Sequence, residues 1–243
     1  MTNLKTEILK IKYTQAFIYA VICLLTCCET PSVPLSPDYT GQKGFVSDIE
    51  GNVYKTVGIG SQIWMAENLR TTRLNDNTPI PMIARDSLWE EVWQAPGYCY
   101  YNNDSVSNKR TYGPLYNYYV VQTGKLCPAG WHVPESAEWN TLVQFLGGEG
   151  IAGGKLKDYN TTLWDGPNPC IANNFDFSAL PGGMRKHYQG QFGGIGTTGC
   201  WWTNTQTNTF NAYLKFLSCY DKGVYEGEYN KRDGCSVRCV KDR

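Results

Sequence analysis

Cysteine thiols are the side chains of this sequence best suited to chemistry, and the chain carries ten of them. Seven follow residue 28, namely Cys99, Cys127, Cys170, Cys200, Cys219, Cys235 and Cys239. In an exported protein such thiols are expected to form disulfides, and an odd number leaves at least one unpaired. Cys200 is predicted to pair with Cys219 or Cys235, since they fall in segments expected to be neighbouring strands. The partners of Cys99 and Cys170 stay open.

Metal binding is the alternative role for the cysteines, and carboxylates elsewhere in the chain are also candidate metal ligands. Cys235 and Cys239 share one face of a predicted strand, where side chains four residues apart stand too far apart to chelate one zinc ion well. Calcium needs about six to eight oxygen ligands. Carboxylates at Asp158, Asp165 and Asp176 would contribute only if the fold brought them together. We therefore predict no metal site.

The two histidines belong to no recognisable catalytic motif. His132 lies in a tight turn beside Trp131 and is predicted to be a structural, hydrogen-bonded residue, whereas His187 is predicted to lie in a solvated loop. The sequence contains no Gly-x-Ser-x-Gly elbow, phosphate-binding loop or His-Glu-x-x-His pair. It predicts no catalytic residue and no cofactor, with an enzyme of unrecognised site as an alternative.

A proline-rich turn followed by a helix is predicted to organise the fold. Residues 125–134, Lys-Leu-Cys-Pro-Ala-Gly-Trp-His-Val-Pro, are typical of a rigid, well-packed turn. Residues 135–146 are predicted to form a helix, which Gly147 and Gly148 end. Its apolar residues recur at helical spacing and define the buried face: Trp139, Leu142, Val143 and Leu146.

Two shorter helices and an irregular stretch are predicted elsewhere. A helix is expected over residues 87–93, with Leu88, Trp89 and Val92 facing inward. A second is expected over residues 112–121, because Pro114 suits a first helical turn. Residues 147–200 are rich in Gly, Asn, Thr and Pro and are predicted to be the least regular part.

Antiparallel strands are predicted at both ends of the folded part. Residues 45–74 read as strands joined by a turn at Asp-Ile-Glu-Gly-Asn, with Trp64 and Met65 in the core. Closing strands are predicted near residues 200–203, 212–217, 223–229 and 235–240. Alternation within the second of these predicts that Lys215 points outward.

The N-terminus is predicted to be a lipoprotein signal peptide covering residues 1–27. Three lysines precede an apolar run at residues 16–25, which has the length of a signal peptide's hydrophobic region and is too short to span a bilayer. The following Leu-Leu-Thr-Cys-Cys resembles a lipobox, so Cys27 or Cys28 is predicted to be lipidated, with Cys27 preferred. A plain secretory signal or an uncleaved anchor is the alternative. Residues 28–43 are predicted to be a proline-rich spacer.

Composition argues against nucleic-acid binding. The chain has 22 basic and 22 acidic residues, without the basic excess that such proteins carry. Aromatic residues make up 14% of the chain, and together with 25 glycines they indicate a turn-rich fold packed by large rings.

Nine motifs, in order, resemble the Fibrobacter succinogenes major paralogous domain family of surface proteins from Bacteroidetes-type bacteria. They lie at residues 48–54, 64–69, 100–104, 112–117, 127–134, 153–156, 179–183, 201–203 and 236–240. The resemblance implies one domain over residues 44–243 with an α+β, C-type-lectin-like fold of short twisted antiparallel sheets, two helices and long irregular loops. Cys127 and Cys239 both lie in these motifs, which implies a disulfide between them.

The resemblance breaks at the start of the central helix. The family carries Thr after the proline of the turn, three residues before the retained Glu138, whereas this chain has Glu135. Either Ser136 caps the helix one residue late or the capping box is lost.

The implied fold also places a ligand-binding face on the irregular stretch before the closing strands. Its candidate residues, which suit sugars, are Tyr159, Trp164, Asp165, Asn168, Asn173, Asn174, His187 and Tyr188. Alternatively, Trp164 covers the core and the asparagines serve turns. We expect an exported lipoprotein of the bacterial envelope that binds a glycan or an envelope protein. It is expected in the outer membrane, on either the periplasmic or the surface face. A structural subunit of a surface appendage is the other alternative.

Overall fold

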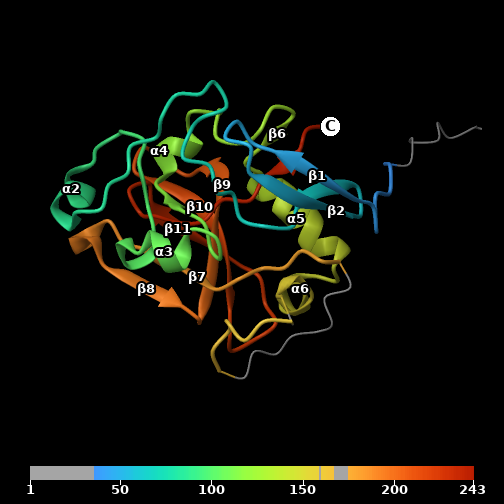
Figure 1. Cartoon of the computed structure of the whole chain (residues 1–243). Helices are drawn as coiled ribbons and strands as arrows, with labels where there is room; N and C mark the ends of the chain where they lie inside the picture. The colour runs from blue at the N-terminus through green and yellow to red at the C-terminus, as the bar shows by residue number, and fades with distance from the viewer. Residues whose placement is uncertain (1–35, 159, 167–174) are drawn as a thin grey trace, which may run out of the picture. The chain divides into compact units, whose positions relative to one another are not determined.

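The computed structural model describes residues 36–158, 160–166 and 175–243 (Figure 1). Within them, Pro37–Arg243 forms a compact unit of mixed helices and short antiparallel sheets, which confirms the α+β class. Its first residues belong to the predicted spacer, yet the Tyr39 backbone N–H already donates to the Gly60 carbonyl (2.7 Å). The predicted signal peptide, Cys27, Cys28, Cys170 and the first half of the spacer lie outside the described residues.

The N-terminal strands begin a five-stranded sheet, ordered β1-β2-β3-β12-β6 in the described residues. Its strands are β1 (Lys43–Ser47), β2 (Val53–Ile59), β3 (Gln62–Met65), β12 (Val240–Lys241) and β6 (Trp131–His132). The predicted turn joins β1 to β2, because the Asp48 carboxylate accepts the backbone N–H groups of Glu50 (3.0 Å) and Asn52 (2.9 Å). Trp64 and Met65 are fully buried, as predicted.

The predicted central helix is α5 (Ser136–Phe145), and it packs against β3 through Trp64 and Gln62 (Figure 1). Trp139, Leu142 and Val143 are buried, and the Trp139 ring lies 5.0 Å from that of Trp64. The capping box is present, contrary to both expectations. Glu135 is itself the N-cap residue, and its backbone N–H donates to Glu138 Oε2 (3.0 Å).

A second sheet closes the fold with β9 (Thr198–Gln206), β10 (Asn211–Ser218) and β11 (Tyr225–Asn230), ordered β11-β10-β9. The outward placement of Lys215 was wrong. Its side chain is buried because α5 covers that face of β10 and supplies an acceptor, Asn140 Oδ1 (2.8 Å). The Glu226 carboxylate, at 2.9 Å, balances the charge.

Short elements make up the rest of the described fold. In chain order they are α2 (Asp86–Glu91), β4 (Tyr98–Cys99), η1 (Tyr101–Asn103), α3 (Ser105–Asn108), β5 (Leu115–Tyr116), α4 (Tyr118–Val121), α6 (Glu149–Leu156), β7 (Gly182–Arg185), η2 (Tyr188–Gly190) and β8 (Phe192–Ile195). Residues 147–200 are thus more regular than predicted, since they contain α6, β7, η2 and β8.

Two of the predicted helices differ from the structure. The helix expected over residues 112–121 is strand β5 followed by the single turn of α4, because the Tyr116 backbone N–H donates to the Cys235 carbonyl (2.9 Å). Asn117 then starts α4 by accepting the Val120 N–H at its side chain. In α2, Trp89 is buried as predicted, whereas Leu88 is 41% exposed.

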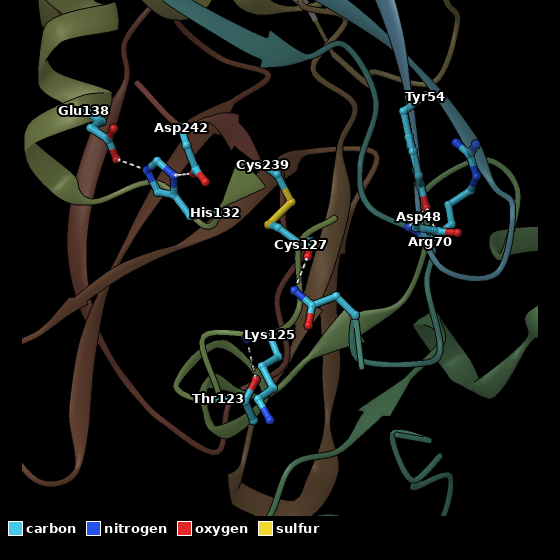
Figure 2. The surroundings of a disulfide bond; sticks show 11 residues. Asp48, Tyr54, Arg70, Thr123, Lys125, Cys127, His132, Glu138, Cys239 and Asp242 are labelled. Carbon is cyan, nitrogen blue, oxygen red and sulfur yellow. Dashed lines mark hydrogen bonds and ion pairs between the residues drawn. A yellow bond between two sulfur atoms is a disulfide. The ribbon is translucent and has the colours of Figure 1, made fainter. Parts of the chain in front are cut away.

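Two connections tie the C-terminal segment to the turn before α5. Cys127 and Cys239 form a disulfide, as the family resemblance implied (Figure 2). His132 lies between two carboxylates, with Nε2 2.9 Å from Glu138 Oε2 and Nδ1 2.6 Å from Asp242 Oδ1. The hydrogen bond with Glu138 raises the pKa of His132 to about 9. His132 is therefore the structural, hydrogen-bonded residue that its position predicted.

Removal of the disulfide is expected to lower stability substantially, because it closes a loop between residues 112 positions apart. The Cys127→Ala, Cys239→Ala double variant should lose about 2–5 kcal/mol of unfolding free energy, measured by urea denaturation. A reductant should destabilise the wild-type protein and leave the double variant unchanged. An equal effect of reductant on both proteins would contradict this assignment.

The His132 contacts predict a specific pH dependence. Because the pKa is raised from about 6.5 in the unfolded chain to about 9 in the fold, the stabilisation is complete below pH ~6.5 and is lost as the pH rises through about 9. The stability difference between wild type and His132→Gln should shrink over that window, in denaturation measured at each pH. Glu138→Gln should flatten the same dependence. Parallel curves of unfolding free energy against pH for wild type and His132→Gln would contradict the raised pKa of His132.

Candidate functional site

The described residues of the predicted ligand-binding face do not come together. Trp164 is a core residue, 5% exposed, whose indole N–H donates to the Ala179 carbonyl (3.1 Å). Its ring is therefore not available on a surface, which corrects its assignment as a ligand contact. Asp165 is exposed beside it, and its backbone N–H donates to Gly196.

His187 and Tyr188 lie elsewhere, beside α2. The His187 ring Nδ1 lies 2.7 Å from Asp233 Oδ1, and Tyr188 is 61% exposed in η2. Tyr159, Asn168, Asn173 and Asn174 fall outside the described residues, so their role stays a prediction.

A different site emerges on the face of β1 and β2. A cavity of about 670 Å³ lies there, within the range of about 300–1,000 Å³ typical of ligand sites. Its lining comes from many separate segments: Lys43, Gly44, Phe45, Lys55, Thr56, Val57, Ala66, Glu67, Asn68, Arg70, Arg110, Thr111, Asp158, Asn160, Asp176, Ser178, Leu180 and Arg238. Asp158 and Asp176, two of the carboxylates considered for calcium, thus share this cavity, and Asp165 does not line it.

The sheet register explains the rim of the cavity. Phe45 is paired directly with Lys55, and Lys43 with Val57, so their side chains project from one face of the sheet. Phe45 is 74% exposed, so its ring is accessible to a ligand at the cavity rim. The rim therefore offers an apolar ring beside two ammonium groups.

Arg70 is held in place by the turn before β2. Its guanidinium pairs with Glu67 (2.5 Å), donates to the Val53 carbonyl (2.8 Å) and lies 4.5 Å above the Tyr54 ring. Tyr54 in turn donates to Asp48 (2.6 Å), as Figure 2 shows for this group. The conformation of the turn thereby fixes the position of a charged wall of the cavity.

Arg238 forms the floor and is fully buried. Its guanidinium packs on the rings of Phe177 (4.2 Å) and Trp201 (5.6 Å) and donates to the Phe177 carbonyl and to Asn68 Oδ1 (2.8 Å). Burial lowers the pKa of Arg238 to about 9, which leaves it charged at neutral pH. Among the described residues no carboxylate lies within ion-pair distance of it, although the charges of Glu67 and Asp158 favour its charged form, and its Nε has no hydrogen-bond acceptor.

Asn68 orients this floor. Its side-chain oxygen also accepts the Trp201 indole N–H (2.8 Å), while its amide nitrogen donates to the Tyr112 carbonyl (2.9 Å) and Ser236 Oγ (3.3 Å). Sequence reasoning missed both residues. For Arg238 the available signal was a basic residue between apolar positions of the motif Ser236-Val-Arg-Cys-Val240. For Asn68 it was an amide within the motif Trp64-Met-Ala-Glu-Asn-Leu69.

Buried thiols are the other groups with possible reactivity. Cys99, Cys200, Cys219 and Cys235 are unpaired among the described residues, so neither pairing proposed for Cys200 is formed. Burial raises the pKa of Cys99 to about 12. Burial, and a hydrogen bond with Cys200, raise that of Cys235. Both are therefore protonated thiols at neutral pH, a poor state for nucleophilic attack.

The described residues contain neither a metal-binding cluster nor a membrane-spanning helix. No group of three or more His, Cys, Asp and Glu side chains in the described ranges could hold a metal ion. No helix of residues 36–158, 160–166 and 175–243 has the length and apolar character to cross a bilayer.

Fold and site together define a disulfide-bonded α+β domain with a surface cavity that is lined by charged and apolar side chains. The chain belongs to the Fibrobacter succinogenes major domain family, whose model matches residues 57–241. Searches of curated proteins and of solved structures each found no significant match. The floor residues Asn68 and Arg238 lie inside the matched range, whereas Lys43, Phe45 and Lys55 of the rim precede it.

The thiol environment predicts resistance to alkylation. With iodoacetamide at pH 8, Cys99 and Cys235 should stay unmodified in the native protein, because both are buried and protonated. Peptide mass spectrometry after labelling would measure this, with the same reaction in urea as the control that labels both. Rapid native labelling of Cys235 would contradict its protonated state and favour a thiol-dependent activity.

Proposed function

We propose that this protein is a lipid-anchored module of the cell envelope that binds a saccharide without catalysis, and that the cavity on β1 and β2 is the binding site. The observation that carries the proposal is the exposed Phe45 ring at the rim of a cavity of about 670 Å³. Saccharides stack their apolar C–H faces on aromatic rings and form hydrogen bonds with charged and amide side chains. Asn160, Asp158 and Arg110 supply such groups around the ring.

The envelope location is supported by the N-terminal sequence and by the cysteine chemistry. Lysines, an apolar run and Leu-Leu-Thr-Cys-Cys precede the folded unit, with Cys27 or Cys28 as the acceptor of the lipid. The Cys127–Cys239 disulfide is typical of proteins folded in an oxidising compartment. We propose anchoring in the outer membrane, and protease shaving of intact cells would identify the face.

The family resemblance also supports a C-type-lectin-like arrangement of the chain. Short antiparallel sheets, a central helix and a disulfide joining the C-terminal segment to the middle of the chain agree with it. An experimental structure compared with lectin-like domains would test this assignment.

The proposed site predicts that Phe45→Ala weakens saccharide binding by roughly tenfold, the effect of losing a contact worth about 1.4 kcal/mol. Saccharides retained by the wild-type protein on a glycan array would be titrated against both proteins by calorimetry. Phe210→Ala is the matched control, because Phe210 is 56% exposed and does not line the cavity.

The two melting temperatures should equal that of the wild type, since neither ring is buried. Retention of no saccharide at all, or equal affinity of the Phe45→Ala and wild-type proteins, would remove the site. An equal loss in Phe210→Ala would show that the ring at residue 45 has no special role.

A further inference from the structure

A second cavity beside α3 shares lining residues with the cavity on β1 and β2. The second has a volume of about 620 Å³ and is lined by Asn52, Val53, Glu67, Arg70, Ser105, Val106, Lys109 and Arg110. Glu67, Arg70 and Arg110 line both cavities. We call the two together the β1–α3 groove, which is an elongated site rather than a single pocket.

Positive charge dominates this groove although the whole chain has a formal net charge of zero. Its basic residues are Lys43, Lys55, Arg70, Lys109, Arg110 and Arg238, and its acidic residues are Glu67, Asp158 and Asp176. Glu67 is paired with Arg70, and Asp176 with Lys43. Among the described residues, the remaining four basic side chains therefore face a single unpaired carboxylate, that of Asp158.

The buried Arg238 is independent support for an anionic ligand. A charged side chain removed from water is costly unless an opposite charge compensates for it. Here the fold supplies carbonyl and amide acceptors and the more distant carboxylates of Glu67 and Asp158, and it leaves Nε without a partner. An anion in the cavity above would reduce this cost, so its binding energy would include compensation of Arg238.

Apolar side chains are interspersed with these cations. Phe45, Val53 and Val106 are 74%, 52% and 93% exposed, and they lie on the groove walls. A simple inorganic anion would use none of them. The pattern fits a chain that presents apolar faces and negative groups in alternation.

We propose that the β1–α3 groove binds an acidic polysaccharide, whose sugar rings pack on Phe45 and the valines while its oxyanion groups pair with Lys55, Lys109 and Arg110. This proposal rests on the proposed saccharide-binding function and adds its ligand class. Guanidinium groups bind carboxylate and sulfate alike through charge-assisted hydrogen bonds. The shared chemistry is therefore a sugar bearing an oxyanion.

An acidic peptide fits the groove less well. A peptide that extends a sheet uses the free backbone edge of a strand, here that of β1. The groove instead lies on a sheet face, where cross-strand pairs such as Phe45 and Lys55 present side chains. Recognition through side chains on that face requires no extended backbone in the ligand.

The test uses the full chain and a short oligogalacturonate, with the carboxyl-reduced oligosaccharide as its neutral counterpart. The Lys55→Gln, Arg110→Gln double variant should bind the acidic probe more weakly by about tenfold or by a larger factor. The salt dependence of its binding should be smaller than that of the wild type. Lys55→Arg with Arg110→Lys should retain binding. The matched control, Lys222→Gln with Lys241→Gln, removes the same charge from exposed residues outside the groove and should bind as the wild type does.

Each alternative outcome has a distinct meaning. If the wild-type protein binds the neutral and the acidic oligosaccharide equally well, and Phe45→Ala loses this binding, the acidic ligand class is wrong and the proposed saccharide-binding function stands. Equal weakening by the control variant would overturn the groove as the site. Binding of polyglutamate and of neither saccharide would overturn both proposals, as would binding of no probe. A sulfated oligosaccharide in the same titration distinguishes sulfate from carboxylate as the preferred oxyanion.

Discussion

The hydrogen bonds of the Asn68 side chain are the interaction on which the rest of this structure depends. A buried amide must have its donors and acceptor satisfied, and here four partners come from three distant parts of the chain, at Tyr112, Trp201 and the segment containing Ser236 and Arg238. This set of hydrogen bonds therefore constrains how these segments are arranged. It sets the depth at which the Arg238 guanidinium lies, and so it gives the cavity a charged floor.

Local sequence patterns predicted the parts of the fold that local interactions determine. The Asp-Ile-Glu-Gly-Asn turn and the apolar stripe of α5 were identified correctly, because each is stabilised by residues close in sequence. Leu115 and Tyr116 were misassigned as helical, since their strand conformation depends on pairing with β4 and on the Cys235 carbonyl far along the chain. Alternation placed Lys215 outward, because the pattern does not include the helix that covers it.

The candidate site was much less accessible to sequence reasoning than the fold. Composition identified aromatic and amide residues between the central helix and the closing strands, but Trp164 belongs to the core and His187 pairs with Asp233. The cavity instead combines the first strands, the residues before β5 and the last motif. These segments are far apart in the sequence and meet only in the folded chain, so no local pattern reveals the cavity. Only the Cys127–Cys239 pair was foreseen at long range, and it came from family resemblance rather than from the physics of the residues.

The position of β12 has a consequence for the order in which this chain can fold. Although it is the last strand in sequence, it lies inside the five-stranded sheet, between β3 and β6 (Figure 1). The sheet therefore remains split until the final residues have left the ribosome, and pairings of such long sequence separation form slowly. The same topology delays the meeting of Cys127 with Cys239, which lie 112 residues apart, until the segment that precedes β12 has been synthesised.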